Sequence, residues 1–313
     1  MVRVIVRRLL ISLPLLVIVS FLTFALVSFT PGDAAYTVLG ARATPEQLAT
    51  VREEMGLDKP LLVQYLTWAG GVIQGDFGNS LLTGQPVVTA IGQRLGPTIA
   101  LVLISALVSI LIAVPLGVIS AVRGGPLGGT IDAVSFAGLA IPNFIFALIL
   151  IPVFAIWLQW LPPSGYVAPH RSLVEWALSL VLPVVALTSG AIGVIAKQTR
   201  SAVGDALGRE FVAIQRANGF SSGSIVWRHV LRLAAVPILA MVGVMMVGLL
   251  SGTVLIETIF AVPGLGGLAV QASAQSDIPM VLGVTVVFTL FVIILNLVLD
   301  LCFVLVNPKV KLV

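Results

Sequence analysis

Six long stretches of the chain are apolar and almost free of charge. A helix needs about 20 mainly apolar residues to cross a bilayer, and each stretch reaches that length. The stretches comprise residues 9–31, 95–122, 133–169, 176–196, 233–256 and 278–299. The pattern therefore predicts an all-α polytopic membrane protein with six transmembrane helices.

The third stretch is longer than one crossing requires. We expect its helix to end near Leu161, because Pro162 and Pro163 follow and proline does not continue a helix. Further prolines lie inside the stretches and predict kinks that neighbouring helices would stabilise. They are Pro14, Pro115, Pro142, Pro152 and Pro183.

The basic residues predict the orientation of these helices. With a cytoplasmic N-terminus, 12 of the 17 Lys and Arg residues lie inside the cell, which agrees with the positive-inside rule. The five on the outside are Arg42, Arg52, Lys59, Arg94 and Arg171. Both termini are then cytoplasmic. The first apolar stretch exceeds the roughly 7–15 residues of a signal-peptide core, so we expect an uncleaved anchor.

Composition supports a membrane protein and excludes several kinds of site. The chain of 313 residues is 58% hydrophobic and only 10% charged, with a mean hydropathy of +1.13. A soluble domain carries about 25% charged residues, so lipid must cover part of this surface. The single cysteine, Cys302, excludes an internal disulfide and a multi-cysteine metal site. A net charge of +4 does not indicate nucleic-acid binding.

A small extracytoplasmic domain, residues 32–94, is expected between the first two membrane helices. Thr44, Pro45 and Gln47 predict the capped start of a helix over residues 43–56. A glycine-containing break and a second helix over residues 61–74 follow, and then a glycine-rich turn at residues 75–80. Two interpretations stay open: a cap packed on the membrane face, or a docking surface for an external partner.

A cytoplasmic loop, residues 198–232, lies within the last region of the chain, residues 95–313, which holds the second to sixth apolar stretches. Phe211, Ile214, Ala217 and Phe220 form an apolar stripe at helical spacing, and Gly219 interrupts it. The loop therefore predicts a helix, a glycine turn and a second helix at the membrane surface. It could be a basic amphipathic segment that binds anionic lipid. Alternatively, it could dock into another protein, with Phe220 anchored in a pocket.

Short motifs along the whole chain carry a family resemblance. They are Arg7-Arg8-Leu9-Leu10, Pro31-Gly32-Asp33, residues 43–48, 56–60 and 75–80, Arg216-Ala217-Asn218-Gly219, His229 with Arg232, Pro237, Glu257 with Phe260, Pro263-Gly264-Leu265-Gly266, Asn296, Asp300 and Asn307-Pro308-Lys309. In number and order they resemble the dipeptide/oligopeptide ABC-transporter permeases, the B-type inner-membrane subunits of bacterial peptide importers.

The resemblance implies a permease subunit that forms half of a pathway for peptides and works by alternating access. It implies a second homologous permease, two ATPase subunits that bind ATP and magnesium, and an extracytoplasmic substrate-binding protein. This chain itself would hold no cofactor or metal. Nickel and glutathione permeases resemble the same family, so the cargo is less well defined than the mechanism.

The resemblance also assigns residues 216–224 as the coupling helix that contacts the ATPase. The expected contacts are Arg216, Ala217, Asn218, Gly219, Phe220 and Ser221. The general Glu-Ala-Ala motif is replaced here by Ala213, Ile214 and Gln215, and Asn218 stands where the peptide subgroup usually has lysine. Pro237 falls later than the general pattern has it, a spacing that suits the peptide subgroup. These departures affect single contacts rather than the position of the element.

Polar residues inside the spans are candidates for the pathway. They are Asn143, Ser189, Ser251, Thr253 and Asn296, with Ser105, Ser109 and Thr188 as further hydroxyls. Hydroxyls in membrane helices often bond to neighbouring backbone instead. An extracytoplasmic gate or docking site is expected at Glu257, Gly264, Gly266 and Gly267, where a re-entrant turn or an ordinary tight loop would fit.

Other function classes are weaker. A membrane enzyme needs a nucleophile and base or metal ligands, but His170 and His229 lie on opposite predicted faces. An ion-coupled carrier often has ionisable groups at mid-membrane. Here Asp132, Glu257 and Asp300 lie at span ends. No Gly-Lys-Ser/Thr motif is present, so ATP would act on another subunit. A scaffolding membrane protein would not require the cytoplasmic loop.

Overall fold

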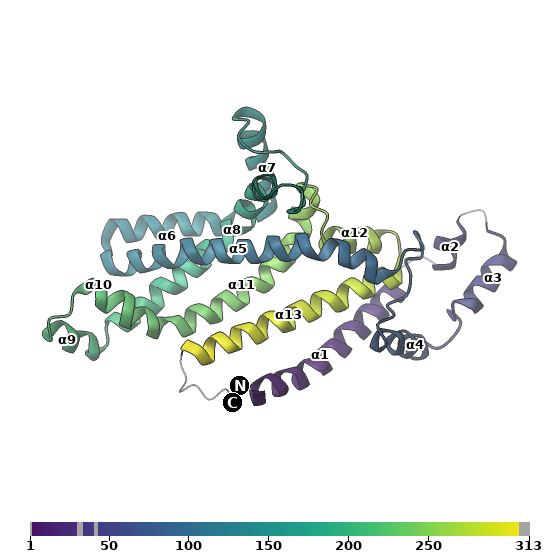
Figure 1. Ribbon diagram of the computed structural model, residues 1–313, viewed down its shortest axis with the longest axis horizontal. Coiled ribbons are helices and arrows are strands. Elements are labelled where there is room, and N and C mark those ends of the chain that lie inside the picture. The colour runs from purple at the N-terminus through teal and green to yellow at the C-terminus, as the bar shows by residue number, and fades with distance from the viewer. Residues whose placement is uncertain (1, 30–33, 41–42, 307–313) are drawn as a thin grey trace. The chain divides into compact units, whose positions relative to one another are not determined.

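A computed structural model of the chain describes residues 2–29, 34–40 and 43–306 (Figure 1). This part is mostly helical and has no strand, only an isolated bridge between Asn79 and Pro86. The all-α prediction is thus confirmed. Some features singled out in the sequence lie outside the described residues: Pro31-Gly32-Asp33, Arg42, Asn307-Pro308-Lys309 and Lys311.

Five helices in the described part are long and apolar enough to cross a membrane. They are α1 (Val2–Ser28), α5 (Val87–Arg123), α8 (Leu173–Leu207), α11 (Leu231–Ile259) and α13 (Ile278–Val306). Each contains most or all of one predicted apolar stretch, so five of the six stretches are confirmed as continuous helices. The count of six crossings and the cytoplasmic position of both termini stay predictions.

The prediction of one helix over the third stretch is wrong. Helix α6 (Gly125–Ala140) ends two residues before Pro142, and Ile141 is extended with ψ 118°. The residue before a proline avoids the helical region, which explains the break. Helix α7 (Asn143–Leu150) and the π-helical turn η1 (Ile151–Trp157) then complete the stretch. The helix therefore ends before Leu161, and Pro142 separates two helices rather than bending one.

The chain divides into two compact units, which we describe separately. The first comprises Met1–Thr98 and Pro263–Ile294. Besides α1 and the first part of α5, it holds α2 (Ala34–Leu39), α3 (Pro45–Glu54), α4 (Leu61–Ile73), α12 (Leu265–Ala274) and the first part of α13. The predicted helices at 43–56 and 61–74 are confirmed by α3 and α4.

Specific hydrogen bonds hold the elements of the first unit. Helix α3 begins with the predicted capping box, in which Thr44 and Gln47 bond each other's backbone at 3.0 and 3.3 Å. Asp277, which is buried, accepts a 2.5 Å bond from the Ser80 hydroxyl and so fixes the loop that precedes α5. A buried apolar cluster joins α5, α12 and α13 around Val87, Leu265 and Val284.

Helix α8 is the centre of the second unit, which comprises Ile99–Val262 and Leu295–Val313. It packs on α6, α7 and α11. The loop between α8 and α11 holds α9 (Glu210–Ala217), α10 (Ser222–Ser224) and the π-helical turn η2 (Ile225–Val230), which leads into α11 (Figure 1). The predicted order of helix, turn and helix is therefore confirmed.

Glycines allow α6 and α8 to approach closely. A Cβ atom at Gly193 of α8 would overlap the Ser135 carbonyl oxygen of α6. A Cβ atom at Gly138 of α6 would lie 2.8 Å from the carbonyl oxygen of Ser189 in α8. Membrane helices lack a hydrophobic driving force between them, so close backbone contact at small residues is a main source of their packing energy. This crossing positions the polar residues discussed below.

Candidate functional site

Residues 209–224 form a tight exposed turn at the loop between α8 and α11. Helix α9 ends in a Schellman motif: Phe220 N–H donates to the Gln215 carbonyl at 3.2 Å, and Gly219 N–H donates to that of Arg216 at 3.0 Å. Gly219 has a φ of +79°, the left-handed conformation that glycine adopts without steric cost. The Ser221 hydroxyl then caps α10 by accepting from Ser224 N–H.

All six predicted coupling residues lie in this one turn, which we call the α9–α10 turn. Arg216 and Ala217 end α9, Asn218 is its C-cap, and Gly219, Phe220 and Ser221 connect to α10. Every one of the six is exposed. Whether they contact another subunit stays a prediction.

The base of the turn is buried, while two large apolar side chains on its outer surface are exposed. Val212, Ile225 and Val226 are buried. By contrast, Ile214 is 54% and Phe220 50% exposed. The predicted stripe thus lies on the surface, except for Phe211, which is partly buried. Exposed apolar side chains on a firmly anchored turn are suited to docking in another protein.

The Phe220 side chain is also held in place from the next helix. Its ring lies edge-on to the His229 ring, with centroids 6.1 Å apart. The His229 Nδ1 atom lies 3.4 Å from the Ser224 carbonyl oxygen. The turn is thus in contact with η2, which is continuous with α11.

Among the predicted pathway residues, Asn143 and Ser189 come together. The Ser189 hydroxyl oxygen lies 3.4 Å from Asn143 Oδ1 and 2.9 Å from the Ala186 carbonyl oxygen, either of which can accept its one hydrogen. A Cβ atom at Gly252 of α11 would lie 3.6 Å from Asn143 Nδ2, so the amide lies against the α11 backbone. Asn143 is the first residue of α7, and the break at Pro142 brings it to this three-helix junction.

The other pathway candidates do not join that junction through their side chains. Thr253 is fully buried and bonds to the Leu250 carbonyl at 2.7 Å, and exposed Ser251 bonds to that of Val247. Thr188 likewise bonds to Val185. Asn296 is exposed on α13. Ser105 and Ser109 are fully buried, one turn apart on α5, and their hydroxyls have no hydrogen-bond partner among the described residues.

The glycines expected at an external gate are mostly helical. Gly264 precedes α12 at its N-cap, but Gly266 and Gly267 lie inside the helix, so a turn at these two positions is wrong. The Leu265 N–H donates to the Thr98 hydroxyl at 2.8 Å, which fixes the start of α12 within the first unit. Glu257 lies in the second unit and is buried near the end of α11.

The second unit contains an ion pair that the sequence did not predict. Asp132 of α6 pairs with Arg200 of α8, and the Ser120 hydroxyl of α5 lies 3.4 Å from Asp132 Oδ1. Asp132 and Lys197 also line a pocket of about 400 Å³. The sequence marked Asp132 only as a residue at a span end. No local pattern relates it to a residue so far along the chain.

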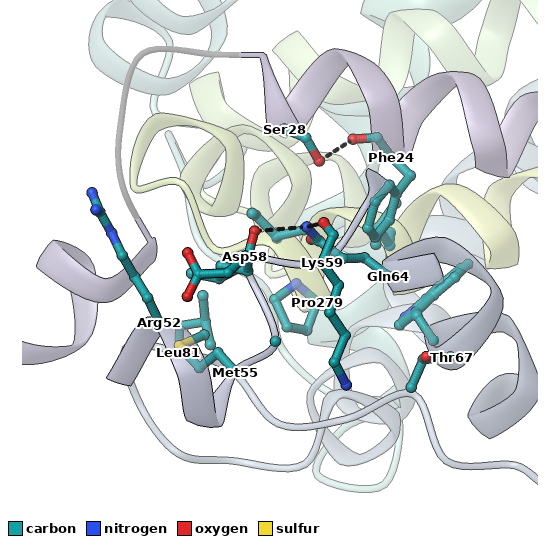
Figure 2. A pocket seen from close by; sticks show the side chains of 15 residues that line it. Phe24, Ser28, Arg52, Met55, Asp58, Lys59, Gln64, Thr67, Leu81 and Pro279 are labelled. Atoms are coloured by element: carbon teal, nitrogen blue, oxygen red, sulfur yellow. Dashed lines mark hydrogen bonds between the residues drawn. The ribbon is translucent and has the colours of Figure 1, made fainter. Parts of the chain in front are cut away.

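The first unit contains a larger pocket, of about 560 Å³ (Figure 2). Its lining combines charged side chains from the end of α3 and the turn after it with apolar side chains of α1 and α13. Arg52, Asp58, Lys59, Phe24 and Pro279 are among them. Gln64 stabilises the turn, because its Nε2 donates to the carbonyls of Leu57 and Lys59 at 2.9 and 2.8 Å.

Known proteins resemble this chain over almost its full length. The chain is 36% identical over 308 residues to the probable peptide ABC transporter permease protein y4tP of Sinorhizobium fredii, covering 98% of each chain. It is 34% identical over 311 residues to the oligopeptide transport system permease protein AppB of Bacillus subtilis, again covering 98% of each.

Solved structures share the fold of part of the chain. Two structures of the MetNI methionine ABC transporter in inward-facing conformations match it with TM-scores of 0.54 and 0.57 at 19% and 20% identity. They cover 70% of this chain and 97% and 96% of theirs.

Two family descriptions match nearly the whole sequence. Residues 1–102 match the N-terminal part of a binding-protein-dependent transport system membrane component. Residues 113–312 match the description "binding-protein-dependent transport system inner membrane component". With its long apolar helices, the chain is a multi-pass inner-membrane protein, and it belongs to the family of binding-protein-dependent transport system inner membrane components.

Proposed function

We propose that this chain is the permease subunit of an ATP-driven importer and forms half of a pathway for di- or oligopeptides. One observation carries the proposal beyond family membership. The α9–α10 turn exposes Ile214 and Phe220 on an anchored base that continues directly into α11. Such a turn can receive motion from another subunit and pass it to a membrane helix.

The coupling residues take separate roles in this proposal. Phe220 acts as the apolar anchor, since buried aromatic side chains often dominate interface energies. Gly219 sets the direction of the turn through its left-handed conformation. Arg216, Ala217, Asn218 and Ser221 surround the anchor and exclude water from the contact.

The pathway is proposed to pass the junction of α7, α8 and α11. Asn143 and Ser189 supply polar atoms there, in helices that are otherwise apolar. Because α7 is a separate short helix, it can change its packing on α8 and α11 without bending a long helix. Alternating access would open this junction to one side of the membrane at a time.

The partners follow from the family and from what the chain lacks. ATP and magnesium would bind to two separate ATPase subunits, because the sequence contains no phosphate-cradling motif. A second homologous permease would complete the pathway, and an external binding protein would deliver the cargo. Peptides are the favoured cargo, because both relatives are named for peptide or oligopeptide transport.

Purification of the full-length chain from its own cells tests this function. We expect an ATPase subunit and a second permease to co-purify, and reconstituted vesicles to take up labelled peptide only with ATP and the binding protein. Mass spectrometry of the ligand retained by the binding protein identifies the cargo. Uptake by this chain alone, without ATP, would contradict the proposal, and retention of only glutathione or a nickel chelate would overturn the peptide assignment.

A further inference from the structure

Helix α4 presents an apolar, uncharged surface that no described residue covers. No charged residue occurs between Lys59 and Asp76, so the whole helix is uncharged. Leu62, Leu66 and Ile73 are 58%, 59% and 87% exposed. At 100° per residue these three positions fall on one face of the helix.

A neighbouring face of α4, which carries Tyr65, packs against α1 within its apolar span. The buried Tyr65 hydroxyl lies 2.9 Å from the Ser20 hydroxyl and donates to the Val17 carbonyl at 3.3 Å. The Phe21 and Phe24 rings of α1 lie edge-on to the Tyr65 ring, with centroids 5.2 and 5.8 Å away. These four contacts, all made by the Tyr65 side chain, fix the position of α4 along α1.

These contacts indicate how deep α4 lies in the hydrocarbon core of the membrane. The apolar span of α1 covers Val6–Ser28. At about 1.5 Å per residue, Val17 lies roughly 16 Å from the Ser28 end. The hydrocarbon core is about 30 Å thick, so Val17 is near its centre. The backbone of α4 passes within one tyrosine side chain of that depth.

The polarity of the chain changes at the start of α4. The charged residues Arg52, Asp58 and Lys59 line the pocket shown in Figure 2, together with Ser28 at the end of α1. After Pro60 the charges stop, and the indole of Trp68 lines the same pocket. Tryptophan is enriched where a membrane meets water. The pocket therefore indicates the level of the interface, and the Tyr65 side chain reaches from this part of α4 toward the middle of the α1 span.

We propose that α4 is a lipid-embedded helix, whose Leu62, Leu66 and Ile73 side chains contact the acyl chains of the leaflet on the side of the Ser28 end of α1. With 13 residues it spans only about 20 Å at 1.5 Å per residue and cannot cross the bilayer. Apolar segments of about 10–14 residues are typical of interfacial or re-entrant elements. The contact of Tyr65 with Val17 inside the apolar span of α1 argues against a water-facing cap, and most residues of that span are also unburied in this chain.

Spin labels on single cysteines test this placement in the full-length chain with its co-purifying subunits, reconstituted in phosphatidylethanolamine–phosphatidylglycerol nanodiscs. Cys302→Ser removes the native cysteine, and Leu62→Cys and Leu66→Cys carry the label. Leu22→Cys on the exposed side of α1 serves as the lipid reference, and Glu53→Cys on α3 as the water reference. Ile73→Cys replaces either α4 variant that fails to fold. The measurement compares collision with oxygen and with a water-soluble nickel chelate.

We expect oxygen to relax the labels at 62 and 66 several-fold more than the nickel chelate does, as at Leu22. Stronger relaxation by nickel, as at Glu53, would overturn the proposal and return α4 to the aqueous side. Low access to both reagents would also overturn it, because a protein partner would then cover the face. Neither result bears on the coupling turn, so this test stands apart from that of the proposed function.

Discussion

At the scale of single residues, five described helices end in the same hydrogen-bond pattern, and two of these five lack glycine in the left-handed position. The helices α3, α4 and α9 each end in a Schellman motif with glycine in the left-handed position, at Gly56, Gly75 and Gly219. Helices α11 and α12 end in the same hydrogen-bond pattern around Ala261 and Ser276, whose φ values are +51° and +56°. The glycines predicted three breaks, whereas alanine and serine gave no signal.

Ala261 therefore carries a conformational cost that glycine would remove. A left-handed residue with a Cβ atom costs about 1–2 kcal/mol. We expect Ala261→Gly to raise the free energy of unfolding by about 0.5–1 kcal/mol, since glycine also gains freedom in the unfolded chain. Chemical unfolding in detergent, followed by circular dichroism, measures the change.

A control on the same helix separates this effect from a general effect of glycine. Ala240 is exposed inside α11, and Ala240→Gly should lower the free energy of unfolding by about 1 kcal/mol. If both substitutions destabilise the protein equally, the strain assigned to Ala261 is absent.

At the scale of elements, continuous hydrophobicity hid the break in the third apolar stretch. Ile141 is apolar like its neighbours, but it precedes Pro142 and is extended. A proline inside a membrane helix can kink or end it, and hydropathy does not distinguish these outcomes. Whether the helix kinks or ends at Pro142 depends on the contacts of α7 with α8 and α11. These contacts involve residues far apart in sequence.

The close crossing of α6 and α8 should be sensitive to one methyl group. Gly193→Ala places a Cβ atom where the Ser135 carbonyl oxygen lies, so the helices must separate. Overpacking of this kind costs about 1–3 kcal/mol. We expect a lower thermal unfolding midpoint and less protein extracted from the membrane in folded form, as measured by fluorescence-detected size exclusion.

Gly204 provides the matched control on the same helix. A Cβ atom there meets no atom within 4 Å. Gly204→Ala should therefore leave the midpoint unchanged or raise it slightly, because alanine favours a helix over glycine by about 0.5–1 kcal/mol. Equal losses from both substitutions would show that the crossing is not tightly packed.

At the scale of the whole molecule, periodic and local features were predictable and pairings were not. Apolar length predicted six membrane helices, of which five are continuous in the described residues, and capping residues predicted the start of α3. The Asn143–Ser189 bond and the Ser80–Asp277 bond join residues 46 and 197 positions apart. Nothing in the local sequence relates such partners, because their contact depends on how distant helices pack.

The distribution of basic residues predicts the orientation of the chain in the membrane. We expect both termini in the cytoplasm, with residues 32–94 outside, because 12 of 17 basic residues then lie inside. In a Cys302→Ser background, an impermeant maleimide added to intact cells should label Gln47→Cys and not Ser222→Cys. The reverse labelling would invert the topology and contradict the assignment of the α9–α10 turn to the ATPase.

We propose that the α9–α10 turn couples ATP hydrolysis to the membrane helices. Gly219→Val forces a β-branched residue into a left-handed conformation, at a cost of roughly 1–3 kcal/mol. Gly84→Val is the matched control, because Gly84 has a φ of +67° in an exposed loop of the first unit. At both positions a Cβ atom meets no neighbour within 4 Å.

The most direct test measures peptide uptake and ATP hydrolysis together in vesicles that contain the purified complex. We expect Gly219→Val to abolish uptake while ATP hydrolysis continues or the ATPase dissociates, and Gly84→Val to preserve both. Phe220→Ala should weaken ATPase binding about tenfold, equivalent to roughly 1.4 kcal/mol. Full uptake by both Gly219→Val and Phe220→Ala would contradict the claim and assign coupling to another part of the chain.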